Sequence, residues 1–548
     1  MSWRKAGLDI PAASPPLEHF DSITMKVENP NSLHSEILLG RPAGPQPETE
    51  EERHQEHFKT DHLLRNLKGH TISSGAVTVS AQGAKFILSL ISTMILARLL
   101  MPRDFGLVAM VTTVTSFLRV FKDAGLSIAT VQRERITHAQ VSNLFWINIA
   151  VSIVSCLVVA AMAPVLAWFY RDPRLIGITL LLSTTYLLSG STVQHQALLK
   201  RQMRFKAMAV IEVSALTTGV IVGVVMALLG FRYWSLVASS LSIEAAGFLL
   251  TWSISRWRPQ LPSRRSGVGP LVRFGANRTA SDFITSVARG SDNLLIGRVF
   301  GPGPVGLYSR ASDLLMRPLE QFLSPINAVF LPALSRLQSQ PERYRSTFLR
   351  VYEAIALIGF LFTGLFLALA RPLTLVMLGQ KWEQAAIIVG GFTIAAFCVP
   401  LANSSTWLFT SQGRGRDLLV AQSINACVTF SSFLVGLPFG PVGVAIAFSV
   451  VSLLVRLPIL YFAVGRRGPV KTTDLWMRFL RHLPLWIVVF VVTWLTRMLV
   501  SNLVPLAQLI ICGPVGLIVA AAVICNFTPQ RKVALHLLET LRELKKKP

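Results

Sequence analysis

From residue 76 onward, runs of about twenty apolar residues alternate with short polar breaks. A helix of about twenty residues crosses the roughly 30 Å hydrocarbon core of a bilayer. Lipid offers no hydrogen-bond partners to the backbone, and these runs lack the two-residue alternation of barrel strands. We therefore predict an all-α integral membrane protein with about fourteen transmembrane helices. The predicted spans are residues 76–97, 105–124, 143–169, 175–197, 210–230, 233–255, 273–297, 305–334, 351–370, 384–410, 418–436, 440–464, 483–500 and 505–525.

The charged residues are few and mostly basic. They make up 15% of the chain, against about 25% in soluble domains, and 53 Lys and Arg face 28 Asp and Glu, a net charge of +25. A nucleic-acid surface is disfavoured, because the basic residues lie in short breaks between apolar runs. With a cytoplasmic N-terminus, roughly thirty basic residues fall on the cytoplasmic side and about eight on the other. This asymmetry predicts that both termini are cytoplasmic.

The two ends of the chain differ from its apolar body. Residues 1–70 are rich in Pro, Glu, His and Ser, which is typical of a disordered cytoplasmic tail, although a miscalled start is the alternative. Residues 528–548 predict a basic amphipathic helix on the anionic inner leaflet. Its apolar face would hold Val533, Leu537, Leu541 and Leu544.

The sequence offers little for catalysis or cofactor binding. No catalytic or nucleotide-binding motif stands in a supporting context, and no two of the five cysteines have metal-ligand spacing. No outer loop exceeds about fourteen residues, which leaves little room for a sugar-processing site. We expect no enzyme activity, no cofactor and no metal.

Two segments, 97–109 and 297–309, match at an offset of 200 residues. The matching pairs are Arg98 with Arg298, Pro102 with Pro302, Gly106 with Gly306, and Leu107 with Leu307. Six spans separate the segments, so the two halves would share one orientation about an axis along the membrane normal, as in many transporters. We expect an N-lobe (71–255), a cytoplasmic linker (256–272), a C-lobe (273–465) and two extra helices (466–527).

Ionisable residues occur inside several predicted spans, where they are costly unless they face a cavity or each other. Interhelical ion pairs are one interpretation, and the charges that end the second span suit snorkelling as well. We favour a hydrated, net basic cavity between the lobes. The candidate substrate-binding residues are Arg278, Arg289, Arg317, Arg310, Lys85, Arg119 and Lys122. The candidates for ion coupling or pairing are Asp282, Glu244, Asp292, Asp313, Glu320 and Asp123.

Three stretches, 96–137, 292–338 and LGQKWEQA at 378–385, resemble the polysaccharide-exporting branch of the multidrug/oligosaccharidyl-lipid/polysaccharide flippase superfamily. The first signature is carried by Arg98, Pro102, Phe105, Gly106, Asp123, Gly125 and Gln132. The second is carried by Asp292, Asn293, Gly297, Gly306, Tyr308, Pro332 and Ser335. The resemblance implies two six-helix lobes with a central cationic cavity and two extra helices.

The resemblance also implies a function. Flippases of the Wzx type carry oligosaccharide repeat units linked to undecaprenyl diphosphate from the inner to the outer leaflet of the inner membrane, for export of a cell-surface polysaccharide. Expected partners are this lipid-linked oligosaccharide, membrane lipids, and polymerase and chain-length proteins. A cation-coupled drug exporter and a polytopic polymerase or ligase are the alternatives. The exporter would favour an acidic and aromatic cavity, and the enzyme would need a larger outer loop.

Overall fold

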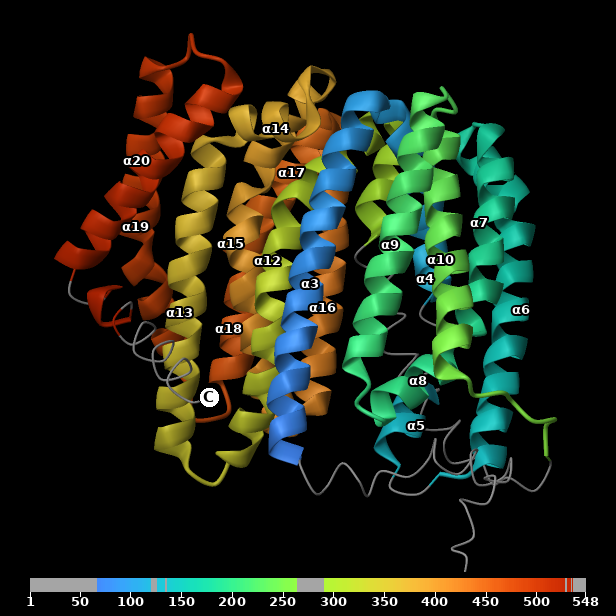
Figure 1. The fold of residues 1–548 in the computed structure, drawn as a ribbon. Coiled ribbons are helices and arrows are strands. Elements are labelled where there is room, and N and C mark those ends of the chain that lie inside the picture. Colours follow the sequence, from blue (N-terminus) through green and yellow to red (C-terminus); the bar gives the residue numbers. More distant parts are fainter. Residues whose placement is uncertain are drawn as a thin grey trace, which may run out of the picture. The chain divides into compact units, whose positions relative to one another are not determined.

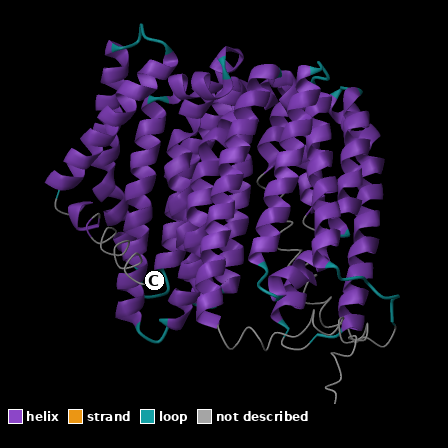
Figure 2. Ribbon diagram, viewed as in Figure 1, coloured by secondary structure: helices purple, strands orange, loops and turns teal. Residues whose placement is uncertain are grey.

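The computed structural model describes residues 67–119, 126–133, 136–263, 290–527, 530–533 and 535. All of them belong to the second of the two units into which the chain divides, His54–Pro548. Across these described ranges the regular structure is helical and contains no strand, as Figure 2 shows. The predicted all-α membrane fold is confirmed.

The N-lobe is drawn in blue to green in Figure 1. Its helices are α3 (Leu67–Leu99), α4 (Pro102–Arg119), α5 (Leu126–Gln132), α6 (His138–Tyr170), α7 (Arg174–Gly190), α8 (Val193–Arg201), α9 (Phe205–Leu228) and α10 (Tyr233–Ser255). Their limits follow local chemistry. Pro102 begins α4, where its missing N–H is no loss, and Thr137 and Gln140 form a capping box before α6.

The remaining helices run from yellow to red in Figure 1. After the helical residues 290–300, they are α12 (Pro302–Arg336), α13 (Pro341–Ala368), α14 (Ala370–Leu378), η1 (Gln380–Trp382), α15 (Glu383–Ser411), α16 (Gly415–Gly436), η2 (Leu437–Phe439), α17 (Gly440–Val451), η3 (Ser452–Arg456), α18 (Leu457–Gly465), α19 (Thr472–Leu499) and α20 (Pro505–Asn526). The π-helical turn η3 joins α17 to α18 without a loop.

Ten segments among the described residues are long and apolar enough to cross a membrane, and one of them, Gly415–Gly465, holds two predicted spans. The predicted span 273–297 lies mostly outside the described residues. The span predicted at 175–197 is divided into α7 and α8. At this break, the hydroxyls of Ser191 and Thr192 donate to the carbonyls of Leu188 and Ser189. Such local bonds compete with the helix. Fourteen spans therefore stays a prediction.

We keep the predicted names, N-lobe for α3 to α10 and C-lobe for α12 to α18, to describe how the helices pack. In the N-lobe α9 packs on α10 and α3, and α6 packs on α7. In the C-lobe α15 packs on α12, α13 and α17. The helices α19 and α20 form a pair beside α13 and α14. The lobes meet where α4 packs on α12 and where α3 packs on α14.

In the described part of the chain, buried apolar residues join the two lobes at one end. We call the end where α3 finishes and α14 lies the upper end, as drawn in Figure 1. One cluster of buried residues there combines Phe105 and Leu107 of the N-lobe with Tyr308, Trp382 and Phe392 of the C-lobe. Among the described residues, the lower parts of the two lobes have separate clusters. The structure is therefore closed between the lobes at the upper end.

The predicted repeat is visible in this closure. A Cβ added at Gly106 would overlap the carbonyl oxygen of Pro302, and one added at Gly306 would overlap that of Pro102. The helices α4 and α12 thus cross at equivalent residues, the proline and the glycine of each repeat. This reciprocity is what a pseudo-twofold axis between the lobes requires.

A second repeated feature lies at the lower end, at an offset of 210 residues. Met203 and Gly413 both have positive φ, 53° and 69°. Directly after them, the backbone N–H groups of Arg204 and Arg414 donate to the carbonyls of Leu199 and Phe409, both at 2.9 Å. The left-handed conformation suits glycine, whereas Met203 adopts it at a steric cost.

The first part of the predicted linker lies along the N-lobe. Residues 256–263 have no regular secondary structure, and Trp146 Nε1 of α6 donates to the carbonyl of Gln260 at 2.8 Å. Asn143 donates to the carbonyl of Ser263 and accepts from its N–H. Residues 264–272 lie outside the described residues, as do residues 1–66 and most of the predicted C-terminal helix.

Candidate functional site

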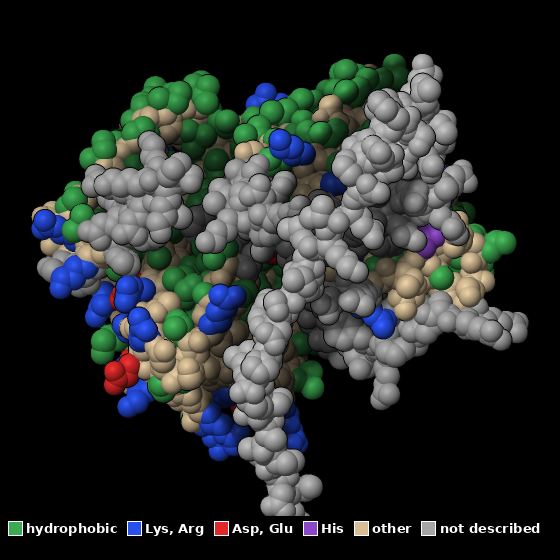
Figure 3. All heavy atoms as spheres, turned by 60° about the horizontal axis from the view of Figure 1, so that its bottom comes forward, with side chains coloured by type: hydrophobic (Ala, Val, Ile, Leu, Met, Phe, Trp, Pro, Cys, Tyr) green, Lys and Arg blue, Asp and Glu red, His purple; other side chains and the backbone are tan. Residues whose placement is uncertain are grey.

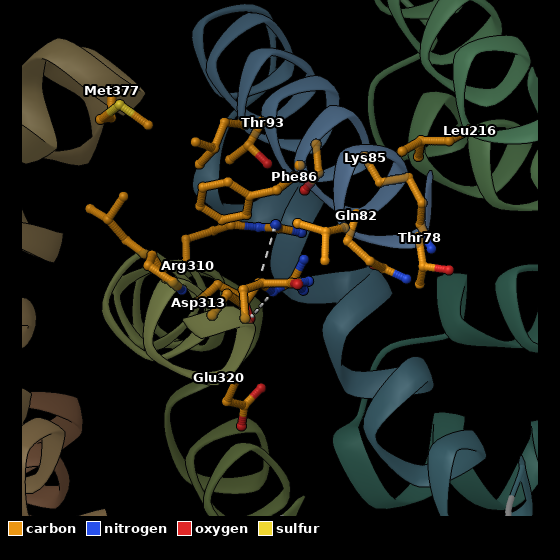
Figure 4. A pocket seen from close by; sticks show the side chains of 18 of the residues that line it. Thr78, Gln82, Lys85, Phe86, Thr93, Leu216, Arg310, Asp313, Glu320 and Met377 are labelled. Atoms are coloured by element: carbon orange, nitrogen blue, oxygen red, sulfur yellow. Dashed lines mark hydrogen bonds and ion pairs between the residues drawn. The ribbon is translucent and has the colours of Figure 1, made fainter. Parts of the chain in front are cut away.

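A cavity of about 1120 Å³ lies between the lobes. One wall is α3 and the facing wall is α12, while α9 contributes Leu216 and α14 contributes Met377 (Figure 4). Met203, at the strained turn before α9, also lines it. The cavity therefore sits where the N-lobe faces the C-lobe, beneath the crossing of α4 and α12.

A polar stripe on α3 forms one side of this cavity. Its members are Thr78, Gln82, Lys85, Ser89 and Thr93. Spacings of three and four residues place side chains on one helix face. Hydroxyl and amide groups can both donate and accept hydrogen bonds, which suits a ligand rich in hydroxyls.

Three charged residues of α12 face this stripe. Asp313 accepts from Arg317 Nε at 2.8 Å and lies 3.3 Å from Arg310 Nη1. The spacings of three and four residues put all three on one helix face. One carboxylate shared by two guanidinium groups leaves a positive charge and several N–H donors for a ligand.

Lys85 has a partner from another helix. Its Nζ lies 2.7 Å from Oε2 of Glu212 on α9, and both side chains are about one-third exposed, at 30% and 37%. Lys85 lines the cavity, whereas Glu212 is not among the lining residues. The pair joins α3 to α9 within the N-lobe and leaves a cation at the cavity wall.

The lining charges nearly balance. Lys85, Arg310 and Arg317 are basic, while Asp313 and Glu320 are acidic, which gives three minus two, or +1, for the described lining. Glu320 has no ion-pair partner among the described residues. The described part of the cavity is therefore weakly basic and rich in arginine.

Two other predicted residues lie away from this lining. Asp292 accepts hydrogen bonds from the Tyr308 hydroxyl at 3.1 Å and from the Asn293 N–H at 2.7 Å. Glu244 lies on α10 and is not among the residues that line the cavity. Asp292 thus has a structural hydrogen-bonding role in the upper core.

Several predicted residues fall outside the description. They are Arg278, Asp282, Arg289, Lys122 and Asp123. For Arg119, which ends α4, only the backbone is described. The pairing of Arg289 with Asp292 and the snorkelling of the residues after α4 stay predictions.

Of the polar stripe of α3, the sequence predicted only Lys85 as a cavity residue. The three- and four-residue spacings of Gln82, Lys85, Ser89 and Thr93 were a usable signal, because they predict one polar helix face. No sequence pattern indicates that Glu212 pairs with Lys85, because the two residues lie 127 positions apart in the chain.

Above the cavity, three hydrogen bonds tie the end of α3 to α14 and to the η1 turn that follows it. Trp382 Nε1 donates to the carbonyl of Ala97 at 2.8 Å, Lys381 Nζ donates to that of Arg98 at 3.2 Å, and Arg98 Nη2 donates to that of Val376 at 2.9 Å. We call these three bonds the upper latch. At the repeat-related position, the guanidinium of Arg298 lies 5.7 Å from the Phe169 ring centroid.

Comparison with known proteins agrees with this architecture. A family model described as polysaccharide biosynthesis protein matches residues 95–387. The lipopolysaccharide biosynthesis protein WzxC of Escherichia coli (strain K12) is 24% identical over 438 residues, which cover 77% of this chain and 87% of the relative. The succinoglycan biosynthesis transport protein ExoT of Rhizobium meliloti (strain 1021) is 29% identical over 327 residues, covering 59% and 66%.

Two solved structures share the fold. The lipid II flippase MurJ in an inward closed conformation has a TM-score of 0.64 at 13% identity, covering 83% of this chain and 99% of its own. A multidrug resistance transporter of the MATE family in an inward-facing conformation has a TM-score of 0.56 at 13% identity, covering 73% and 99%. These likenesses show that the chain shares its helical fold with these two proteins.

Proposed function

Because this chain belongs to the family of polysaccharide biosynthesis proteins, we propose that it moves a lipid-linked oligosaccharide repeat unit from the inner to the outer leaflet by alternating access. The cargo would be an oligosaccharide on undecaprenyl diphosphate, destined for lipopolysaccharide O-antigen, exopolysaccharide or capsule. The observation that carries the proposal is the cavity between the lobes, where Arg310 and Arg317 of α12 face the polar stripe of α3, which includes Lys85.

The chemistry of the walls supports an anionic, hydroxylated cargo. An unpaired ion in hydrocarbon costs tens of kcal/mol by idealised estimates, so a diphosphate needs counter-charges along its path. Guanidinium groups match phosphate oxygens two at a time, and Arg310 and Arg317 share a single carboxylate partner, Asp313. The hydroxyl and amide groups of α3 would meet the sugars while the lipid tail stays in the bilayer.

The same function gives a role to the other candidates. We propose that Arg278, Arg289, Arg119 and Lys122 extend the basic path, with Arg289 near the diphosphate. Glu244 and Asp282 are the proposed carboxylates for coupling to a proton or Na⁺. Movement of an anion outward would also gain about 2.3 kcal/mol per charge for each 100 mV of membrane potential.

We propose that the lower end faces the cytoplasm of the inner membrane. Basic side chains gather around this end in Figure 3. The exposed ones on the C-lobe and its following loop are Arg336, Arg343, Arg345, Arg350, Arg416, Arg466, Arg467 and Lys471. Such clusters favour the cytoplasmic side, and the closed upper end would then block the exit to the outer leaflet.

The function can be tested by deleting the gene and by reconstitution. Deletion should abolish the surface polysaccharide and accumulate its lipid-linked repeat unit in the inner leaflet. Purified protein in liposomes should move a fluorescent oligosaccharide on a polyprenyl diphosphate, and Arg310→Ala should slow this movement more than Arg310→Lys. Normal surface polysaccharide in the deletion strain, or efflux of cationic dyes without movement of the lipid, would contradict the proposal.

Polymerase and chain-length proteins are proposed partners in the same pathway. Their substrate would be the repeat unit that this protein delivers to the outer leaflet. Crosslinking in cells that make the polysaccharide, followed by identification of the crosslinked proteins, would test these contacts.

A further inference from the structure

We propose that Phe105 and Trp382 are positioning residues that link the occupancy of the cavity at Arg310 to the state of the upper latch. The inference rests on the proposed function, because the occupant is taken to be the anionic head of the transported lipid. It assigns to these two aromatic residues a control over when the upper end opens.

The first step of the link is a contact between Arg310 and Phe105. The guanidinium carbon of Arg310 lies 4.5 Å from the centroid of the Phe105 ring. Its Nε is buried and has no hydrogen-bond partner among the described residues, while the same side chain lines the cavity. An anion in the cavity would therefore compete with the ring for this guanidinium, because ring faces attract cations more weakly than phosphates do.

The second step joins Phe105 to Trp382. The two rings meet edge to face with centroids 5.2 Å apart. Trp382 is fully buried, and its Nε1 donates to the carbonyl of Ala97 in the upper latch. A shift of the Phe105 ring would thus press on, or withdraw support from, the indole that holds the latch.

The position of these rings on the crossing of α4 and α12 makes the link mechanical. Phe105 precedes Gly106, and Arg310 follows Gly306 by about one helical turn. The crossing leaves no room for a Cβ at either glycine. In such dense packing, small displacements are passed to neighbours rather than absorbed.

With an empty cavity, Arg310 rests on Phe105, Phe105 supports Trp382, and the latch is closed. An anionic head at Arg310 draws the guanidinium away from the ring, and the loss of this support releases Trp382 from Ala97. The upper end would then open after the head group has arrived, which protects the membrane from leakage.

The test measures opening directly rather than transport. Thr93, which lines the cavity, is replaced by cysteine in a chain whose five native cysteines have been removed, and right-side-out vesicles are treated with an impermeant maleimide. A cysteine at Ser501, which is exposed in the turn between α19 and α20, reports that the reagent is active. Vesicles are loaded with inorganic pyrophosphate or with buffer alone.

Trp382→Phe keeps the ring and removes one latch bond. It should raise labelling at position 93 about fivefold without pyrophosphate, the change expected for one hydrogen bond. The matched control is Trp146→Phe, which removes an indole bond of the same 2.8 Å length to the linker carbonyl of Gln260. It should leave labelling unchanged, and equal labelling of wild type and Trp382→Phe would overturn the role of the latch.

Phe105→Leu removes the ring that supports Trp382, so labelling should already be raised without pyrophosphate. Pyrophosphate should raise labelling in wild type, and this rise should be lost in Phe105→Leu and reduced in Arg310→Lys, which keeps the charge without the planar stack. A normal rise in both variants, or none in wild type, would overturn the link. The expected labelling in a protein that does not move the lipid-linked oligosaccharide would contradict only the proposed function.

Discussion

Gly106 of α4 lies against the carbonyl of Pro302, which begins α12, and the repeat-related Gly306 lies against the carbonyl of Pro102. The two lobes therefore meet through one contact made twice. Both helices start with proline. In each helix, a glycine one turn later allows the first turn of the other helix to pack directly against its backbone. Transmembrane helices that approach this closely use small residues at the contact.

This contact predicts a strong effect of Gly106→Ala. The added methyl group would overlap the backbone of α12, so we expect the free energy of unfolding to fall by about 1–3 kcal/mol, as in other overpacked interiors. Gly306→Ala should behave alike. Thermal unfolding of the detergent-solubilised protein measures the effect.

Gly303→Ala is the matched control for this prediction. Gly303 lies in the same first turn of α12, but a Cβ there meets no atom within 4 Å. The melting temperature of this variant should equal that of wild type or exceed it slightly, since alanine restricts the unfolded chain. Similar losses in Gly303→Ala and Gly306→Ala would show that the helix turn, and not the crossing, is sensitive.

The charge asymmetry predicts the membrane topology. Reporter fusions after Pro548 and within 256–270 should report a cytoplasmic location, because basic loops stay on that side. A fusion at Ser501, in the turn between α19 and α20, should report the opposite side. A periplasmic signal from either of the first two would overturn the orientation and, with it, the outward direction of transport.

Residues 1–68 should be dispensable. Their composition resembles that of disordered segments, which cannot bury enough apolar surface to fold. Deletion of this segment should leave both membrane insertion and surface polysaccharide at wild-type levels. If the truncated protein accumulates normally but export stops, the segment has a direct role in transport.

Asp172 gives a prediction about pH. Arg174 donates to this carboxyl from Nε at 2.9 Å and from Nη2 at 2.5 Å, and these bonds hold the pKa of Asp172 below its ordinary value of 3.8. A lowered pKa stabilises the folded state above pH 3.8, and this contribution is lost as the pH falls through the folded-state pKa. Asp172→Asn should therefore lower stability by about 1 kcal/mol at pH 7.

The check is a series of melting temperatures between pH 7 and pH 3. The difference between wild type and Asp172→Asn should shrink as Asp172 becomes protonated. Arg174→Gln should give the same pH profile, because it removes the other partner. A difference that stays constant over this range would mean that Asp172 contributes through packing and not through its charge.

The helices could be predicted from the sequence more fully than the site, and the reason is physical. The span predicted at 233–255 coincides with α10, because the cost of burying polar groups in lipid marks a helix within its own sequence. The span predicted at 351–370 corresponds to the longer α13, which starts at Pro341. Hydropathy identifies the part of a helix that lies in lipid. The first turns of α13 carry charged residues and extend into water, so hydropathy does not include them.

The site depends on which helix faces which. Periodicity shows that Arg310, Asp313 and Arg317 share one face, but the partner of that face is set by the packing of distant segments. The contact of Arg310 with Phe105 spans about 200 residues, and Lys85 with Glu212 spans 127. Only the repeat gave the sequence a hint of such pairing, because it placed the starts of α4 and α12 in equivalent positions.

The ion pair of Lys85 with Glu212 allows structural and functional roles to be separated. Lys85→Glu alone would place two carboxylates together between α3 and α9, so we expect the protein to lose stability. The exchange of both residues, Lys85→Glu with Glu212→Lys, restores an ion pair and should restore normal protein levels. Export should nevertheless remain impaired, because the exchange puts a carboxylate on the cavity wall, where Glu212 itself does not lie.

The matched control is the exchange Arg345→Asp with Asp474→Arg. This pair joins α13 to α19 at 2.5 Å, and neither residue lines the cavity. Its exchange should restore both protein level and surface polysaccharide. If the Lys85 and Glu212 exchange also restores surface polysaccharide fully, the cation at position 85 only holds α3 against α9, and the diphosphate must find its counter-charges on α12 alone.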